Sequence, residues 1–272
     1  MGAAILRAVH ELYDEPPKIL NDPVVPLLVD HAVLQQVTSN TQWMNDRLVA
    51  ALRSHIVLRS RYAEDCLREA VDDGVQQCVI LGSGFDTFAY RQPAWASALR
   101  IFEVDHPASQ RAKLERLTAS KIPVPSNVEF VSGDFETASL PEILQASSLD
   151  FAGPAFFSCL GVLVYLDPGS TKTIFRLAGS FPKRSELVFS FSQGNRAGAA
   201  PGGIAALEKE AAALGEPWRA YYDPDALCRE LLEAGFSSAI PLSPEEASRV
   251  YYRSNGDGLP PPRRTSLIRA IV

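Results

Sequence analysis

The sequence of 272 residues has few of the features that mark disulfide-bonded, metal-binding or nucleic-acid-binding proteins. Its four cysteines lie far apart without a Cys-x-x-Cys pair and its four histidines do not cluster, so neither a disulfide framework nor a Cys/His zinc site is expected. Lys and Arg number 26 against 32 Asp and Glu, a net charge of -6. This balance argues against a nucleic-acid partner, because phosphate binding relies on an excess of basic residues.

Long apolar runs are also missing. No run approaches the roughly 18 residues of a membrane span, and the segment MGAAILRAVHEL lacks the cationic start and long apolar region of a signal peptide. Leu6 stands where a myristoylation signal needs Ser or Thr. Because 46% of the residues are hydrophobic, the chain has enough apolar surface for a large core. We expect a cytoplasmic protein without a membrane partner.

From residue 76 onward, short apolar runs alternate with segments of helical periodicity. The runs are rich in β-branched and aromatic residues and predict seven strands, at 78–81, 99–104, 128–131, 155–160, 187–191, 236–242 and 266–272. Apolar residues recur every three or four positions in three crossover segments, at 107–120, 171–180 and 224–234. This alternation predicts an α/β fold with a doubly wound, seven-stranded, mostly parallel sheet.

The first 75 residues show no strand pattern and predict a helical cap in front of the α/β core. Residues 43–71 carry apolar side chains at helical spacing, and prolines interrupt the segments before them. Two later stretches, 194–203 and 254–262, are rich in Gly and Pro and predict mobile connections or a lid. We therefore divide the chain into a cap (1–75) and a core (76–272), with an insertion around 194–223.

The most informative segment is the apolar run at 79–81 followed by Gly82-Ser83-Gly84. A strand that enters a Gly-x-Gly turn and then a helix places the turn at the carboxyl edge of the sheet, where ligands bind in such folds. Glycines let a ligand approach the backbone, and a helix N-terminus offers free N–H groups. The alternative is a tight turn without a ligand.

A second strand ends in Glu103-Val104-Asp105, a little over 20 residues after the glycines. A carboxylate at this spacing is typical of a site that binds an adenosine ribose through its two hydroxyl groups. Thr87 occupies the place of the third glycine in a dinucleotide fingerprint, which disfavours NAD and FAD. No Walker motif occurs, and Leu81 and Phe85 stand where a nucleophile elbow needs glycine. The pattern favours another adenosine-containing cofactor.

A third strand ends in Ser132-Gly133-Asp134-Phe135 and brings another acid to the same edge. The carboxylate of Asp134 is placed to accept a hydrogen bond from an adenine amino group, while the next backbone N–H donates to the ring. Capping of the following helix is the alternative role of Asp134. Because acids end successive strands at the same edge, the pattern favours binding of a cofactor over helix capping.

Several motifs extend these observations: LGSGFDTFAYR (81–91), FEVDHP (102–107), VSGDFE (131–136), LGVLVYL (160–166), VLRSRYAEDCL (57–67) and Asn-Asp-Pro (21–23). Together they resemble the leucine carboxyl methyltransferase family, in the bacterial branch that includes polyketide carboxyl O-methyltransferases. The resemblance covers most of the chain. It implies a class I methyltransferase fold, whose last strand is antiparallel, and S-adenosyl-L-methionine as the cofactor.

The resemblance also implies a role for individual positions. It places Gly82 and Gly84 against the methionine part of the cofactor and Asp105 on the ribose. Asp134 and Phe135 fall at the adenine, and Arg59 falls at the cofactor carboxylate. A planar guanidinium matches both carboxylate oxygens. Arg61 is the alternative to Arg59. For either residue, the other interpretation is a solvated arginine on a helix surface that binds no ligand.

Two positions depart from the family pattern. Family members that methylate a protein C-terminus carry a Glu where this chain has Leu160, and that Glu would hold the cofactor's amino group. We expect carbonyl groups near Ser158 and Cys159 to replace it. Bacterial members often carry Arg where this chain has Phe88, which puts any role of that position in doubt.

The expected reaction is O-methylation of a carboxylate on a small molecule, such as a polyketide-like secondary metabolite. A carboxylate is ionised at neutral pH, so no general base is needed. Tyr165 is expected near the sulfur, with a core tyrosine as the equal alternative. The cap and residues 194–203 are expected to close over an acceptor pocket, whose candidate lining is Arg196, Trp218, Tyr221 and Tyr222. A solvated loop and an ordinary aromatic cluster are the alternatives for these four.

Two other functions stay open at this stage. Methylation at a phenol oxygen, nitrogen or carbon of a small molecule would demand a base or a preformed nucleophile in the pocket. A non-catalytic cofactor-binding homologue is the other alternative, and Leu160 is its support.

Overall fold

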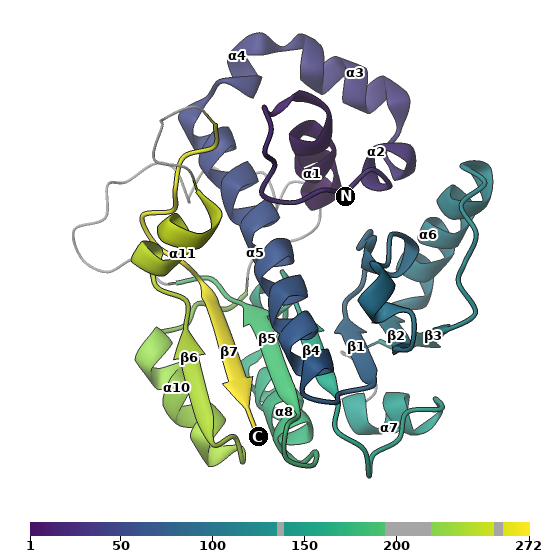
Figure 1. The fold of residues 1–272 in the computed structure, drawn as a ribbon, viewed down its shortest axis with the longest axis vertical. Coiled ribbons are helices and arrows are strands. Elements are labelled where there is room, and N and C mark those ends of the chain that lie inside the picture. Colours follow the sequence, from purple (N-terminus) through teal and green to yellow (C-terminus); the bar gives the residue numbers. More distant parts are fainter. Residues whose placement is uncertain (135–138, 194–218, 253–257) are drawn as a thin grey trace.

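The computed structural model describes residues 1–134, 139–193, 219–252 and 258–272, and its centre is a seven-stranded sheet (Figure 1). The strands are β1 (Gln77–Leu81), β2 (Arg100–Asp105), β3 (Val128–Ser132), β4 (Phe156–Cys159), β5 (Glu186–Ser190), β6 (Ser238–Pro241) and β7 (Leu267–Ile271). Every strand predicted from the sequence is present, with boundaries within two residues of the prediction.

The strand order is β3-β2-β1-β4-β5-β7-β6, and β7 runs antiparallel to β5 and β6. The pairs among β1 to β5 are parallel. The prediction of a doubly wound, mostly parallel sheet is therefore confirmed. Because β1 lies between β2 and β4, the chain changes direction across the sheet at β1, and ligands bind at such a point, outside the carboxyl ends of the strands.

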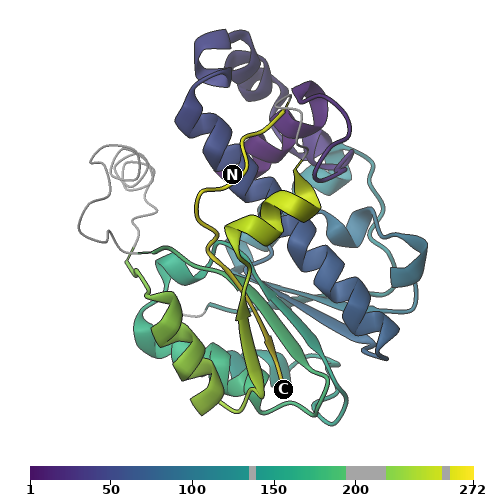
Figure 2. The same ribbon diagram turned by 60° about the vertical axis from the view of Figure 1, so that its left-hand side comes forward.

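Helices cover both faces of the sheet (Figure 2). One face carries α5 (Arg47–Asp72), α6 (Pro107–Ala119) and α11 (Pro244–Tyr251), and the other carries α7 (Leu140–Gln145), α8 (Pro168–Gly179) and α10 (Pro224–Glu233). Successive strand residues point to opposite faces, so Ile101 packs in the α5 cluster while Phe102 packs with α7, α8 and α10. Among the described helices, none is both long and apolar enough to cross a membrane.

The remaining helices lie at the end of the sheet to which the parallel strands point (Figure 1). They are α1 (Gly2–Tyr13), α2 (Val25–Leu28), α3 (His31–Ser39) and α4 (Thr41–Met44). Their small core includes Val9, Val25 and Leu34. Phe85, which follows the turn Gly82-Ser83-Gly84 (the glycine loop), packs against this core. By contrast, Ala63 and Leu67 of α5 pack on the sheet. Helix α5 thus joins the cap to the core, and the division at residue 75 stays a prediction.

Four helices begin with a proline directly after a capping side chain. Asp167, Asp223, Ser243 and His106 each accept a hydrogen bond from a backbone N–H in the first turn of the helix that follows. Proline suits the first helical position because its missing N–H has no helical partner there anyway. This signal places the start of α8 at Pro168, three residues before the predicted start at 171.

The helix expected directly after Gly84 is wrong. The Asp86 carboxylate accepts a hydrogen bond from the N–H of Phe88 at 2.8 Å, and the chain makes only a short 3-10 turn, η1 (Phe88–Tyr90). Pro93 then prevents continuation, because it lacks an N–H and disfavours helical geometry in the residue before it. A second 3-10 turn, η2 (Ala94–Ala96), follows. No α-helix N-terminus therefore contributes to the glycine loop.

Candidate functional site

The glycine loop lies directly against the carboxyl end of β2. The N–H groups of Gly82 and Ser83 donate to the carbonyl oxygen of Val104 at 2.8 and 3.2 Å, and the N–H of Gly84 donates to the Asp105 carboxylate. Asp105 also accepts from the N–H of His106 at 2.7 Å. The predicted meeting of the loop with the end of β2 is therefore present in the structure.

Both glycines adopt backbone conformations that other residues rarely adopt. Gly82 has φ +64°, and a Cβ there would lie 2.4 Å from Cγ2 of Val162, which follows β4. Gly84 has φ +44°, and the nearest atom to a Cβ there would be the carbonyl oxygen of Gly82 at 3.9 Å. Gly82 is thus required by close packing, while at Gly84 no described atom outside the loop lies within 4 Å of where a Cβ would be.

The end of β3 lies beside the end of β2. The N–H of Gly133 donates to the carbonyl oxygen of Asp105 at 3.0 Å, so the partly exposed Asp134 follows immediately after this contact. Phe135 lies outside the described residues. The acids Asp105 and Asp134 are thus at one edge, next to the glycine loop.

Glu103, two residues before Asp105, has a different environment. Its side chain is fully buried, and it accepts hydrogen bonds from Nζ of Lys113 at 2.7 Å and from the Tyr90 hydroxyl at 3.0 Å. Burial raises the pKa of Glu103, and the Lys113 ammonium opposes that rise. The other carboxylate oxygen has no hydrogen-bond partner among the described residues. Glu103 therefore forms an ion pair with Lys113 in the core, whereas Asp105 lies at the carboxyl edge of the sheet, beside the glycine loop.

Arg59 approaches the same edge from α5. A Cβ at Gly161, just after β4, would lie 2.8 Å from both terminal nitrogens of Arg59, so the guanidinium rests directly on this glycine. Burial and the charge of Arg7 lower the pKa of Arg59 to about 10. Within the described ranges, its guanidinium forms neither a hydrogen bond nor an ion pair. A cation in this position suits an anionic ligand.

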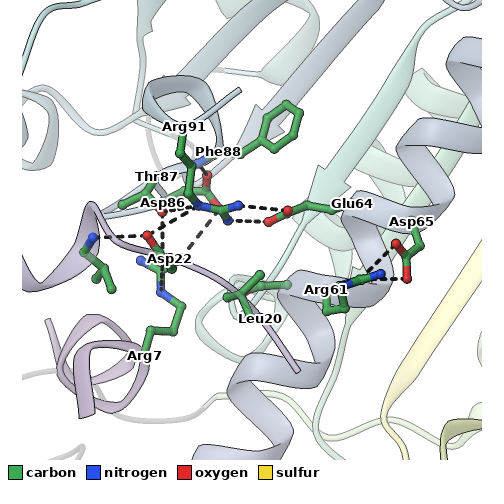
Figure 3. A network of polar contacts seen from close by, with 12 residues as sticks. Arg7, Leu20, Asp22, Arg61, Glu64, Asp65, Asp86, Thr87, Phe88 and Arg91 are labelled. Atoms are coloured by element: carbon green, nitrogen blue, oxygen red, sulfur yellow. Dashed lines mark hydrogen bonds and ion pairs between the residues drawn. The ribbon is translucent and has the colours of Figure 1, made fainter. Parts of the chain in front are cut away.

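Arg61, the alternative to Arg59, points elsewhere. It is exposed and pairs with Asp65 one turn further along α5, with a distance of 2.9 Å between its Nε and the carboxylate. Figure 3 shows this pair apart from the contacts of the glycine loop. Arg59, and not Arg61, therefore lies at the carboxyl end of the sheet.

Tyr165 ends the 3-10 turn η3 (Leu163–Tyr165), which follows Gly161. Its charge and that of Asp86 both act on the Arg59 guanidinium, which places the three side chains in one region. After the insertion the chain returns to this region, since the N–H groups of Arg219 and Ala220 donate to the carbonyl of Val164 at 2.7 and 3.3 Å. Tyr165 therefore lies near Arg59, and its role beside the cofactor sulfur stays a prediction.

The candidate acceptor residues are only partly within the described structure. Arg196, Trp218 and the stretch 194–203 lie outside it. Tyr221 is 43% exposed and follows the segment that contacts η3. Tyr222 is partly buried, and its hydroxyl forms a hydrogen bond of 2.8 Å with Thr171 of α8. The role of these residues stays a prediction.

The motif residues after the glycines hold the cap against the loop (Figure 3). Asp22, which is buried, accepts a hydrogen bond from the Thr87 hydroxyl at 2.7 Å and pairs with Arg91 at 3.3 Å. Arg91 also binds the Glu64 carboxylate with two nitrogens. Arg7 of α1 donates to the carbonyl of Phe85 and lies 3.6 Å from Asp22. Thr87 of the Asp-Thr motif and Arg91 of the Tyr-Arg motif thus hold the cap and α5 against the core.

Leu160 and Phe88, the two residues that depart from the family pattern, both make apolar contacts. Leu160 packs between the α5 cluster and the cluster formed with α11. Phe88 is buried against Trp95, with 5.9 Å between the ring centres. Neither side chain offers a polar group to a ligand, so the amino group of a cofactor must meet another acceptor, such as a carbonyl after β4.

Sequence reasoning missed three polar residues at this edge. Ser83 is buried, and its hydroxyl oxygen has no hydrogen-bond partner among the described residues. Arg7 contacts the loop from α1, and His55 lies one helical turn before Arg59. Only His55 carries a signal in the sequence, because its four-residue spacing places it on the same face of α5 as Arg59.

These residues fit S-adenosylmethionine. The open space over Gly84 and the orphaned Ser83 hydroxyl suit the methionine part, Arg59 suits its carboxylate, and Asp105 suits the ribose. A separate open groove of about 600 Å³ lies along α6, lined by residues that include Arg111 and Leu114, and does not touch the glycine loop. No cluster of His, Cys, Asp or Glu in the described part of the chain is arranged to hold a metal.

The strand order, the antiparallel β7 and the glycine loop after β1 define a class I methyltransferase fold. A model of the family described as "Leucine carboxyl methyltransferase" matches residues 1–178, and the chain belongs to this family.

Individual proteins agree with this assignment. The Bacillus subtilis (strain 168) protein "Putative S-adenosyl-L-methionine-dependent methyltransferase YktD" is 27% identical over 281 residues, covering 94% of this chain and 91% of that protein. SCO7813 of Streptomyces coelicolor, with the same description, is 30% identical over 203 residues, covering 71% and 70%.

Solved structures share the fold. The crystal structure of a DUF574 family protein from Streptomyces avermitilis has a TM-score of 0.58 at 15% identity, covering 100% of this chain and 96% of that one. A crystal structure described as a putative methyltransferase from Thermobifida fusca also has a TM-score of 0.58, at 16% identity, covering 99% and 93%.

Proposed function

We propose that this protein, an S-adenosylmethionine-dependent methyltransferase, transfers the methyl group to a carboxylate oxygen of a small molecule. Membership of a methyltransferase family and the descriptions of its relatives support the general activity. One observation supports the site: the Arg59 guanidinium, which has no ion-pair partner among the described residues, and the Asp105 carboxylate lie at the same sheet edge, on either side of the glycine loop.

Each of these groups has a distinct task in binding. Arg59 binds the cofactor's carboxylate, and Asp105 accepts hydrogen bonds from the ribose hydroxyls. Asp134 and Phe135 are proposed at the adenine. Gly84 leaves room for the methionine part, and the Ser83 hydroxyl gains the partner that it lacks. Together they fix the direction from which an acceptor must approach.

When bound, S-adenosylmethionine supplies a methyl group on a positively charged sulfur. A carboxylate oxygen held in line with that sulfur would take the methyl group, and the electron pair of the broken sulfur–carbon bond would stay on the sulfur. No proton moves, because the acceptor is already ionised. The protein therefore contributes alignment and the exclusion of water rather than a base.

The family favours a carboxylate acceptor. The family description refers to carboxyl methylation. Arg7 and Arg59 are close enough for their charges to repel each other, and Asp86 is the acid that acts on Arg59 from the loop. Arg7 is paired with Asp22 and Arg59 is assigned to the cofactor, so another group must bind the acceptor. Residues 194–203 and the cap are proposed to cover the acceptor site.

The proposal is tested with methyl-labelled S-adenosylmethionine and a panel of aromatic acids, fatty acids, phenols and amines. We expect S-adenosylhomocysteine to form with at least one carboxylic acid, and the product to release labelled methanol in mild base, because methyl esters hydrolyse and ethers or methylamines do not. A base-stable product from a phenol or an amine would replace the carboxylate with that acceptor. No product from any class would support a non-catalytic homologue.

A further inference from the structure

The face of α5 that packs on the sheet continues beyond the sheet edge. Ala63, Cys66 and Ala70 form this face, in a cluster with residues of β1, β2, β4 and β5. Continuing the same row toward the start of the helix, by steps of four residues, gives Arg59 and then His55. Arg59 already rests on Gly161, after the end of β4.

Helix α5 runs opposite to the parallel strands, because it ends at Asp72, just before β1 begins at Gln77. Its first half therefore rises past the carboxyl edge toward the cap, as Figure 1 shows. His55 lies in that half, on the face that turns toward the sheet. His55 thus lies one helical turn further from the sheet than Arg59, close enough for the Arg59 charge to act on its ring.

His55 is partly buried yet has no hydrogen bond or ion pair with any described residue. The other three histidines have different surroundings: His10 contacts Asp14 and Leu20, His106 caps α6, and His31 is exposed at the start of α3. Burial and the charge of Arg59 lower the pKa of His55 to about 4. The ring is therefore neutral near pH 7, with one N–H to donate.

We propose that His55 is an acceptor-binding residue, which donates a hydrogen bond from its neutral ring to the carboxylate that is methylated. The inference rests on the proposed function and names the residue that recognises the acceptor. A neutral N–H orients a carboxylate oxygen without transferring a proton to it, so the oxygen keeps the electron pair that forms the new bond. Arg59 remains committed to the cofactor.

The first test follows His55 directly by NMR in the full chain with labelled histidine side chains, loaded with S-adenosylhomocysteine. The chain has four histidines and therefore few ring signals. The signal that disappears in the spectrum of His55→Gln is assigned to His55. We expect benzoate or octanoate to shift the His55 signal, and the matched alcohols benzyl alcohol and octanol to leave it in place. No shift with either acid, or an equal shift with the alcohols, would overturn the proposal.

The second test separates donation of a hydrogen bond from removal of a proton. With benzoate or octanoate as acceptor, His55→Leu is expected to lose about tenfold or more in kcat/KM, mainly through KM, because a hydrogen bond to a charged group is lost. His55→Gln keeps an N–H donor and is expected to stay within about threefold of the wild type. His31→Leu is the control at an exposed histidine.

The outcomes distinguish this inference from the proposed function. If His55→Gln is as inactive as His55→Leu, the donor role is wrong. If both variants lose S-adenosylhomocysteine binding as strongly as they lose activity, His55 acts on the cofactor and the proposal fails. If the acids shift the His55 signal but are not methylated, carboxylate methylation fails while the contact of His55 with a carboxylate stands.

Discussion

Arg59→Ala is expected to weaken the binding of S-adenosylhomocysteine by about 2–5 kcal/mol, a loss of roughly 30-fold or more in affinity. The guanidinium rests on Gly161 and forms no ion pair with any described residue, so we expect the cofactor's carboxylate to be its partner. Removing the guanidinium would leave that carboxylate facing the sheet edge with no cation. The dissociation constant is measured by calorimetry.

The helix offers a matched control for this variant. Arg61→Ala removes an exposed arginine whose ion pair with Asp65 is worth little, and we expect less than about 1 kcal/mol of change in binding or stability. Arg59→Lys keeps the charge but loses the planar fork, and should bind with intermediate affinity. If Arg61→Ala loses binding and Arg59→Ala does not, the carboxylate contact has been assigned to the wrong arginine.

Glu103→Ala is expected to lower the free energy of unfolding by about 3–5 kcal/mol. Both Glu103 and Lys113 are fully buried, with 2.7 Å between Oε2 and Nζ, so the variant leaves an ammonium group in the core without its counter-ion. The Tyr90 hydroxyl loses its acceptor as well. Urea unfolding followed by circular dichroism measures the change.

The double variant Glu103→Leu/Lys113→Met tests the cause of that loss. It removes both charges together, and such replacements are often neutral, so we expect much of the stability to return. Folded Glu103→Ala should still bind S-adenosylhomocysteine with nearly the wild-type affinity. Loss of cofactor binding without loss of stability would mean that Glu103, and not Asp105, meets the ribose.

The sheet could be predicted closely because its central strands β1, β2, β4 and β5 are short runs of mostly buried side chains. β1, with all five residues buried, is the clearest case. The short helices α7 and α11 were missed, since six and eight residues are too few to show a periodicity. The helix expected after Gly84 was wrong because the Asp86 carboxylate accepts the N–H of Phe88 and Pro93 prevents continuation, both of which are local effects.

The candidate site residues were named largely from the family resemblance, and the structure shows where spacing along one helix separates the alternatives. Arg59 is on the sheet-facing row of α5 with Ala63 and Cys66, whereas Arg61 is turned away from it. The contacts of Asp22 with Thr87 and of Arg7 with Phe85 join positions 65 and 78 residues apart. No local pattern encodes such pairs, so the use of the Asp-Thr motif as an attachment point for the cap became visible only in the structure.

The central claim is that the glycine loop and Asp105 form the cofactor site. It is tested most directly by calorimetric titration of S-adenosylhomocysteine, and of NAD as a control, into the wild type and into Asp105→Ala. We predict one S-adenosylhomocysteine site per chain, no binding of NAD, and an affinity weaker by about 1–3 kcal/mol in the variant, because the ribose hydroxyls lose charge-assisted hydrogen bonds. Absence of S-adenosylhomocysteine binding at millimolar concentration, or equal affinity in a folded Asp105→Ala variant, would contradict this assignment.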